Sequence, residues 1–246
     1  MDRGLYIAMS GAKQILQAQA SNANNLANTT TPGFRADLEQ QRTMPVFGPG
    51  EPSRVYALTE RPGYDFKPGA MQYTGRTLDV AVEDAGWIAV QTQDGKEAYT
   101  RAGNLEITAE GRLLTDSGLP VLGNDGPIDI PPSQKLEIGP DGTISIVPLG
   151  ANPNEMAAIN QMKLVNPDSK NLEKQTDGLM HLKEGTTSPV SADVKMISGF
   201  LEGSNVSNIE EMVQMIQLAR HFENQIKVMK NLDDNSRASS DIMRMG

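Results

Sequence analysis

Histidine, serine and glycine residues offer few of the arrangements that enzymes use. The two histidines, His181 and His221, lie forty positions apart and form no paired-histidine metal motif. No serine has a glycine two places before it and another two places after it, so a nucleophile elbow is absent. The Gly95-Lys96 pair is followed by Glu97, where a phosphate-binding loop needs serine or threonine. The sequence therefore predicts no catalytic residue, no metal site and no cofactor.

Neighbouring carboxylates leave one enzymatic alternative open. Glu83 and Asp84 could serve as acid and base in a β domain that binds or cleaves carbohydrate. Such a site also needs exposed aromatic rings, and the candidates are Trp87, Tyr73 and Tyr99. Acidic residues at turns more often shape the turn and keep the surface soluble. A structural role is therefore the stronger interpretation.

Composition and charge restrict the possible partners. The chain has 246 residues, of which 38% are hydrophobic, which is enough for a folded core. Its net charge is −9, which is the sum of −10 in residues 36–204 and +1 in the two ends together, so we expect no binding to nucleic acid. No cysteine is present, and no apolar run is long enough for a secretory signal or a membrane span. We therefore expect no membrane insertion, and export from the cytoplasm would need another route.

Proline divides the chain into helical ends and a β middle. All 15 prolines lie between Pro32 and Pro189, and no glycine falls between Gly203 and Gly246. The fold class expected is α+β, with an antiparallel pair of N- and C-terminal helices and a central, mostly antiparallel β domain. The predicted parts are an N-terminal helix and turn (1–35), an extended connector (36–76), a central β domain (77–190), a return segment (191–204) and a C-terminal helix (205–246). Within the connector, the prolines and glycines of residues 44–70 predict little regular structure.

Both ends carry apolar residues at helical spacing. In the first helix, which should end near Asn28, apolar and amide residues recur every three or four positions. In the last helix, Ser207 and Glu210 have the spacing of a capping box. The apolar surface exceeds what one partner helix could cover, so we expect both ends to be disordered in the monomer and to order on assembly. The predicted assembly residues are Leu5, Ile15, Leu26, Met212, Met215, Ala219, Phe222, Ile226 and Met229.

Short runs of strand-forming residues fill the middle, separated by dipeptides such as Asp94-Gly95 and Asp141-Gly142 that favour tight turns. An antiparallel sheet domain follows from this pattern. The predicted strands are 78–82, 87–91, 105–108, 128–130, 136–138, 143–147 and 158–165.

Two blocks at opposite ends resemble the bacterial flagellar basal-body rod and hook protein family. The first is residues 25–34, Asn-Leu-Ala-Asn-Thr-Thr-Thr-Pro-Gly-Phe, and the second is residues 201–207, Leu-Glu-Gly-Ser-Asn-Val-Ser. Residues 78–82, Gly86-Trp87 and Tyr99-Thr100-Arg101 are similar to the central β region of the larger members. The pattern looks most like the proximal rod type, with distal rod or hook-type members as the alternative. The motif and helix-exit residues are Asn25, Leu26, Ala27, Asn28, Gly33, Phe34, Ser204, Asn205 and Val206.

The resemblance implies a structural subunit without catalytic or cofactor residues. Family members stack in helical order as the rod that transmits motor torque across the periplasm. The expected partners are copies of the chain, other flagellar rod and hook-type subunits, and the flagellar type III export apparatus. Export by that apparatus would account for the missing signal peptide. Asn25, Asn28, Gly33 and Phe34 are expected to fix the turn that leaves the inner, helical layer.

Overall fold

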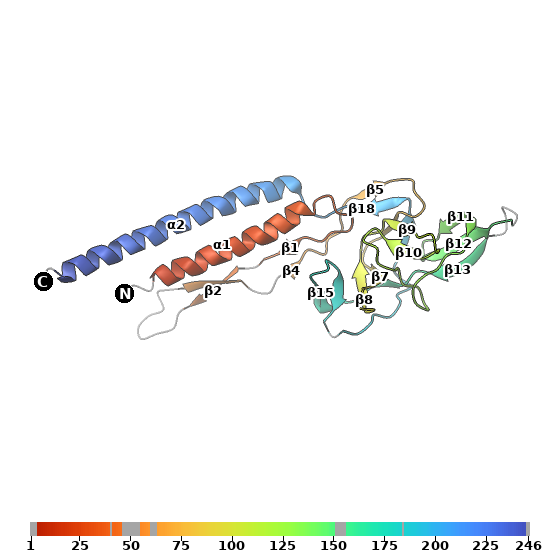
Figure 1. The fold of residues 1–246 in the computed structure, drawn as a ribbon, viewed down its shortest axis with the longest axis horizontal. Coiled ribbons are helices and arrows are strands. Elements are labelled where there is room, and N and C mark those ends of the chain that lie inside the picture. Colours follow the sequence, from red (N-terminus) through yellow and green to blue (C-terminus); the bar gives the residue numbers. More distant parts are fainter. Residues whose placement is uncertain are drawn as a thin grey trace. The chain divides into compact units, whose positions relative to one another are not determined.

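The computed structural model describes residues 4–39, 41–45, 55–59, 63–150, 156–183 and 185–244, which form two compact units (Figure 1). Unit 1 comprises Met1–Thr29, Arg35–Asp65 and Val206–Gly246. Unit 2 comprises Thr30–Phe34 and Phe66–Asn205. The terminal helices contact each other in unit 1, and the paired strands are antiparallel. The predicted α+β class is confirmed.

Two long helices dominate unit 1. Helix α1 runs over Gly4–Ala27 and ends next to the position that the sequence predicted. Helix α2 runs over Asn208–Arg244 and begins directly after Ser207, whose hydroxyl accepts a 3.5 Å hydrogen bond from the Glu210 backbone. No described residue of α2 is buried. Neither helix, within the described ranges, has an apolar stretch that could cross a membrane.

Four short strands accompany the helices in unit 1. Strand β1 (Asp37–Leu38) pairs with β4 (Gly63–Tyr64), and β2 (Gln41–Pro45) pairs with β3 (Val55–Thr59) in a ribbon that contacts α1. The prediction of little regular structure in 44–70 is therefore wrong for residues 44–45, 55–59 and 63–64, which lie in paired strands. Each of these strands has only two to five residues, and pairing between such short strands leaves no local signal in the sequence. Residues 40, 46–54 and 60–62 lie outside the described ranges.

Unit 2 is built from antiparallel strands. Its largest sheet has five strands in the order β14-β7-β8-β16-β15, and a second sheet has the order β11-β12-β13. Three further pairs, β9 with β10, β6 with β17 and β5 with β18, complete the described strands, together with the 3₁₀ turn Ser169–Asn171. The strand bounds are β5 (Met71–Tyr73), β6 (Val80–Val82), β7 (Trp87–Gln91), β8 (Glu97–Thr100), β9 (Leu105–Ile107), β10 (Leu113–Thr115), β11 (Ser133–Ile138), β12 (Thr143–Pro148), β13 (Ala157–Gln161), β14 (Leu164–Val165), β15 (Leu172–Lys174), β16 (Met180–Leu182), β17 (Met196–Ser198) and β18 (Phe200–Glu202).

An apolar core holds the sheets of unit 2 together. Ile88, Leu105 and Ile144 are among its fully buried members, drawn from different strands. The predicted strand at 128–130 is wrong, because these residues form a single isolated bridge, Asp129 with Arg112, although Ile128 is buried in the core. The predicted strand at 158–165 is divided into β13 and β14, which pair in different sheets.

Candidate assembly interface

Small side chains let α1 and α2 approach closely at one end of their contact. Ala8 and Ala12 are buried, and a Cβ on Gly11 would lie 2.8 Å from the side-chain nitrogen of Gln225. That nitrogen donates a 2.9 Å hydrogen bond to the Ala8 carbonyl. A glutamine therefore reaches the backbone of the opposite helix because the residues facing it are small.

An amide and carboxylate cluster joins the same helices further along. Asn22 donates from its side chain to the Glu211 carbonyl at 3.1 Å and also to the Glu211 carboxylate. Asn25 donates to the same carboxylate at 3.4 Å. The Asn22 contact lies fourteen residues along α1 from Ala8, and Glu211 lies fourteen residues back along α2 from Gln225. The antiparallel register thus holds over about four helical turns.

Asn25 also fixes the segment that follows the helix. Its amide nitrogen donates to the Asp37 carbonyl at 3.0 Å, and its amide oxygen accepts from the Asp37 backbone nitrogen at 2.9 Å. This double hydrogen bond gives β1 the pairing that a neighbouring strand would provide. The Asn24 carbonyl near the helix end accepts twice from Asn28, from its side chain at 2.9 Å and from its backbone nitrogen at 3.2 Å.

In a single copy of the chain, some of the predicted assembly residues are half-buried and the others are exposed. On α2, the half-buried positions include Met215, Phe222 and Met229, which recur at intervals of seven together with Glu211, Leu218 and Gln225. The exposed group comprises Leu5 on α1 and Met212, Ala219 and Ile226 on α2, whereas Ile15 and Leu26 are half-buried. Intermolecular contacts for these nine residues stay a prediction.

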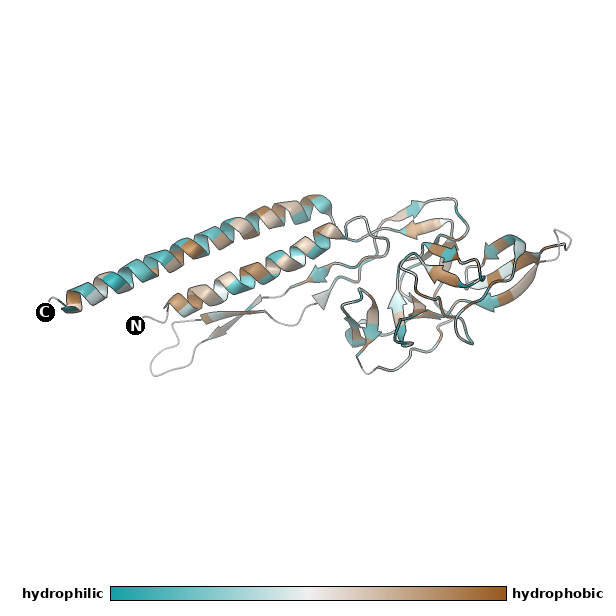
Figure 2. Ribbon diagram, viewed as in Figure 1, coloured by the Kyte–Doolittle hydropathy of each residue, from teal (hydrophilic) through white to brown (hydrophobic). Residues whose placement is uncertain are grey.

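Apolar surface remains uncovered on the first half of α2. Ile209 is 77% exposed, and Met212, Val213 and Ile216 are each at least half exposed. Figure 2 shows hydrophobic residues more frequent in this half of the helix than in the half that follows. An exposed apolar stretch of this kind is typical of a surface that binds another protein.

A buried ion pair organises unit 2. Arg101, 4% exposed, donates from Nη1 to the carboxylate of the fully buried Glu202 at 3.0 Å. The same guanidinium donates to the carbonyls of Val82 at 3.1 Å and Asp84 at 2.6 Å, and lies 5.5 Å from the centre of the Trp87 ring. The hydrogen bonds satisfy charges whose burial would otherwise be costly.

Three separate stretches of chain meet at this ion pair. The Glu202 carboxylate accepts from the Gly69 backbone at 2.9 Å, and its carbonyl accepts from the Gly33 backbone at 2.8 Å. A Cβ on Gly33 would lie 2.3 Å from the Arg101 carbonyl carbon, and the φ of Gly33 is +69°. Only glycine fits this close approach.

The remaining motif residues differ in their contacts and in their exposure. The Phe34 carbonyl accepts from the Asn205 backbone at 3.3 Å, and the Lys174 ammonium lies 3.9 Å from the Phe34 ring centre. The Asn205 side chain donates to the Lys67 carbonyl at 3.1 Å. Ala27 is exposed, and Ser204 and Val206 are half-buried. Sequence reasoning included Arg101 and Glu202 in the family pattern but assigned them no role, because nothing local indicates that they pair.

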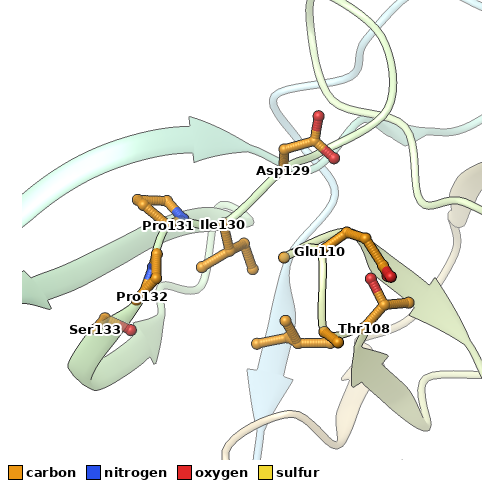
Figure 3. Close-up of a pocket in the computed structure, with 10 residues that line it drawn as sticks. Thr108, Glu110, Asp129, Ile130, Pro131, Pro132 and Ser133 are labelled. Carbon is orange, nitrogen blue, oxygen red and sulfur yellow. The ribbon is translucent and has the colours of Figure 1, made fainter.

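The described residues that the carbohydrate alternative needs do not form a suitable site. Two of its three aromatic candidates, Trp87 and Tyr99, are buried, and only Tyr73 is exposed. A hollow of about 580 Å³ in unit 2, drawn in Figure 3, has no aromatic residue in its lining. Of its carboxylates, Asp129 pairs with Arg112 at 3.1 Å, and hydrogen bonds to its own backbone and to Thr108 lower the pKa of Glu110. A general acid would need a raised pKa instead.

The histidines do not form a site either. The His181 Nε2 atom lies 2.9 Å from an Asp177 carboxylate oxygen within unit 2, and His221 is exposed on α2. Among the described residues, no group of three or more histidines and carboxylates could hold a metal ion.

Comparisons with known proteins match the chain at both ends and in the middle. Residues 5–35 match the flagella basal body rod protein family, residues 81–146 the flagellar hook protein FlgE/F/G D1 domain, and residues 197–242 the C-terminal region of the flagellar basal body rod FlgEFG proteins. The flagellar basal-body rod proteins FlgF of Salmonella typhimurium and Escherichia coli are 41% and 43% identical, each over the full length of both chains. The rod protein FlgG of Bacillus subtilis is 33% identical over 95% of this chain and 96% of its own.

The chain therefore belongs to the flagellar basal-body rod protein family. It is a structural subunit of the basal-body rod, a part of the machinery of motility, and not an enzyme. Family membership also implies that it assembles with rod subunits. The family and structural role predicted from the end motifs are confirmed.

Proposed function

We propose that this chain is a torque-transmitting subunit of the proximal part of the rod, the part to which the sequence pattern points. The FlgF proteins of Salmonella typhimurium and Escherichia coli, at 41% and 43% identity, are more similar to this chain than FlgG of Bacillus subtilis at 33%, which supports this position over the distal rod. In this proposal, the chain polymerises in helical order with its own copies and with other rod and hook-type subunits across the periplasm. It leaves the cytoplasm through the flagellar type III export apparatus.

The main support for this proposal is the exposed apolar surface of the terminal helices. Most of the large apolar side chains that are exposed among the described residues belong to unit 1, including Ile209 and Ile216 on α2. Covering one such side chain contributes about 1.5–3 kcal/mol, so neighbours that cover several would stabilise a polymer strongly. The helical regions 1–35 and 205–246 then form the assembly domain. The β domain within 77–190 supplies the outer part of the subunit, joined through 36–76 and 191–204.

The nine predicted assembly residues give a direct test. Phe222→Asp or Met215→Asp, produced in a strain that lacks the native gene, should abolish swimming while unit 2 stays folded. The physical reason is that a charge in the helix contact must be desolvated without a partner. Asn224→Asp is the matched control, because it adds the same charge at an exposed position of the same helix. Normal swimming of the Phe222 and Met215 variants would contradict the proposal.

Electron microscopy of basal bodies separates the proximal position from its alternative. Loss of a proximal subunit should stop the structure while the proximal part of the rod is still incomplete. Basal bodies that lack only the distal segment or the hook would instead assign the chain to a distal rod or hook-type position.

A further inference from the structure

A polar cavity lies inside unit 1, between α1, α2 and the strand that follows α1. Its volume is about 300 Å³, far above the roughly 30 Å³ that one water molecule occupies in the liquid. Three carboxylates line it, those of Asp37, Glu39 and Glu211. The other lining residues are all uncharged, and they are Ala18, Ser21, Asn22, Asn25, Leu38, Gln214 and Leu218.

The cavity contains hydrogen-bond acceptors that lack donors. Asn22 is 3% exposed, and its side-chain oxygen has no hydrogen-bond partner among the described residues. The orientation of this amide is determined by its neighbour, because its nitrogen donates to the Glu211 carboxylate, and an oxygen in that position would be repelled. One carboxylate oxygen of Glu39 is likewise buried without a partner. Buried acceptors of this kind are normally satisfied, so these two oxygens lack a donor that the described residues do not supply.

We infer that this cavity binds the ammonium or guanidinium group of a lysine or arginine side chain from a second copy of the chain. Such a group is positively charged and carries three to five N–H donors without an acceptor, which complements a lining of carboxylates and an unpartnered amide oxygen. The inference rests on the proposed polymerisation, because the cation comes from a neighbouring copy.

The helices of unit 1 provide suitable cations on their exposed faces. Arg237 is already paired with Asp233 at 2.8 Å, which leaves five candidates on the described helices. All five are exposed, and they are Lys13, Arg220, Lys227, Lys230 and Arg244. The electrostatics of the cavity agree with this occupant. Burial and the charge of Asp37 raise the pKa of Glu39, and burial raises the pKa of Glu211 despite the hydrogen bonds from Asn25 and Asn22. A bound cation would relieve this crowding of negative charge.

Cross-linking in purified basal bodies tests the inference, because the chain has no cysteine of its own. Leu38→Cys places a thiol on the cavity lining without removing any acceptor, and Leu38 is 47% exposed. It is combined with a cysteine at each of the five candidate positions in turn, and a short bifunctional thiol reagent is added. Ile107→Cys, at a 38% exposed position of unit 2, replaces Leu38→Cys in the matched controls.

We expect at least one pairing with Leu38→Cys to give cross-linked dimers at roughly ten times the yield of its control. Glu39→Gln and Asn22→Ser, added to that pairing, should each reduce the yield. If the variants enter basal bodies and no pairing exceeds its control, the cavity holds water or another partner and the inference is wrong. If the cysteine-free chain itself is absent from basal bodies, the proposed function fails instead.

Discussion

Removing one charge from the Arg101–Glu202 pair should destabilise unit 2 strongly. Arg101→Met leaves the fully buried Glu202 carboxylate without its counter-charge, and Glu202→Leu leaves the buried guanidinium without its counter-charge. Breaking a buried pair in this way costs about 3–5 kcal/mol, a large part of the roughly 5–15 kcal/mol that holds a domain together. Arg101→Met should be the worse of the two, because the carbonyls of Val82 and Asp84 also lose their donor.

The single tryptophan provides the assay. Trp87 lies against Arg101, so its fluorescence during urea unfolding of the full chain reports on unit 2 at the site of the change. The double variant Arg101→Met, Glu202→Leu should cost less than the two single variants added together, because no unpaired charge remains. The exposed pair between Arg112 and Asp129 is the control, and Arg112→Met should change the free energy of unfolding by less than about 1 kcal/mol.

The result that would refute this reasoning is specific. If Arg101→Met and Glu202→Leu each cost no more than Arg112→Met, or if the double variant costs their full sum, the buried pair does not act as a coupled unit. The meeting point of residues 30–34, 66–70 and 200–205 would then depend on backbone contacts alone.

Three further predictions concern the turn and the helices. In urea unfolding, Gly33→Ala should destabilise unit 2 by clearly more than Gly95→Ala. Both glycines have positive φ, but of the two only Gly33 has backbone atoms of another segment where a Cβ would lie. Equal losses of unfolding free energy in the two variants would contradict the close approach. The circular dichroism signal of the helices should strengthen as pH falls from 7 towards 4.5, because the pKa values of Glu211 and Glu39 are raised in the folded chain. Protonation of these two carboxylates therefore stabilises the fold. Their contribution is complete below the ordinary pKa of 4.5 and is lost as pH rises through the folded-state pKa. Glu211→Gln should flatten this dependence, and an unchanged curve would exclude Glu211 as its source. Hydrogen exchange of residues 205–230 should be fast in a monomeric sample and slow in assembled rods, and slow exchange in the monomer would show that α2 is stable without neighbours.

Local physical chemistry allowed much of this fold to be predicted. Proline cannot continue a helix, so its confinement to the middle of the chain marked both terminal helices. Glycine tolerates positive φ, and the predicted turns at Gly95 and Gly142 have φ values of +76° and +82°. Strand β7 occupies the range that its apolar, β-branched residues indicated. Each of these signals lies within a few residues of the element it predicts.

The candidate interface was predictable only in part, for the same reason. Phe222 and Met229 lie at half-buried positions of α2, as helical spacing suggests. The hydrogen bond from Asn22 to the Glu211 carboxylate was not foreseen. The strands of residues 37–64 were missed because each is too short to be recognised before its partner is known.

The sequence by itself determined that this protein has two terminal helices, an acidic β middle and the end motifs of a rod subunit. Only the tertiary structure decided that Arg101 pairs with Glu202, that Asn25 holds Asp37, and that acceptors from three elements line one cavity. Helix periodicity, turn conformation and proline geometry act between neighbouring residues and can be read in order along the chain. A buried charge or amide has no such local rule, because its partner is whichever group the packing of distant segments brings within hydrogen-bond distance.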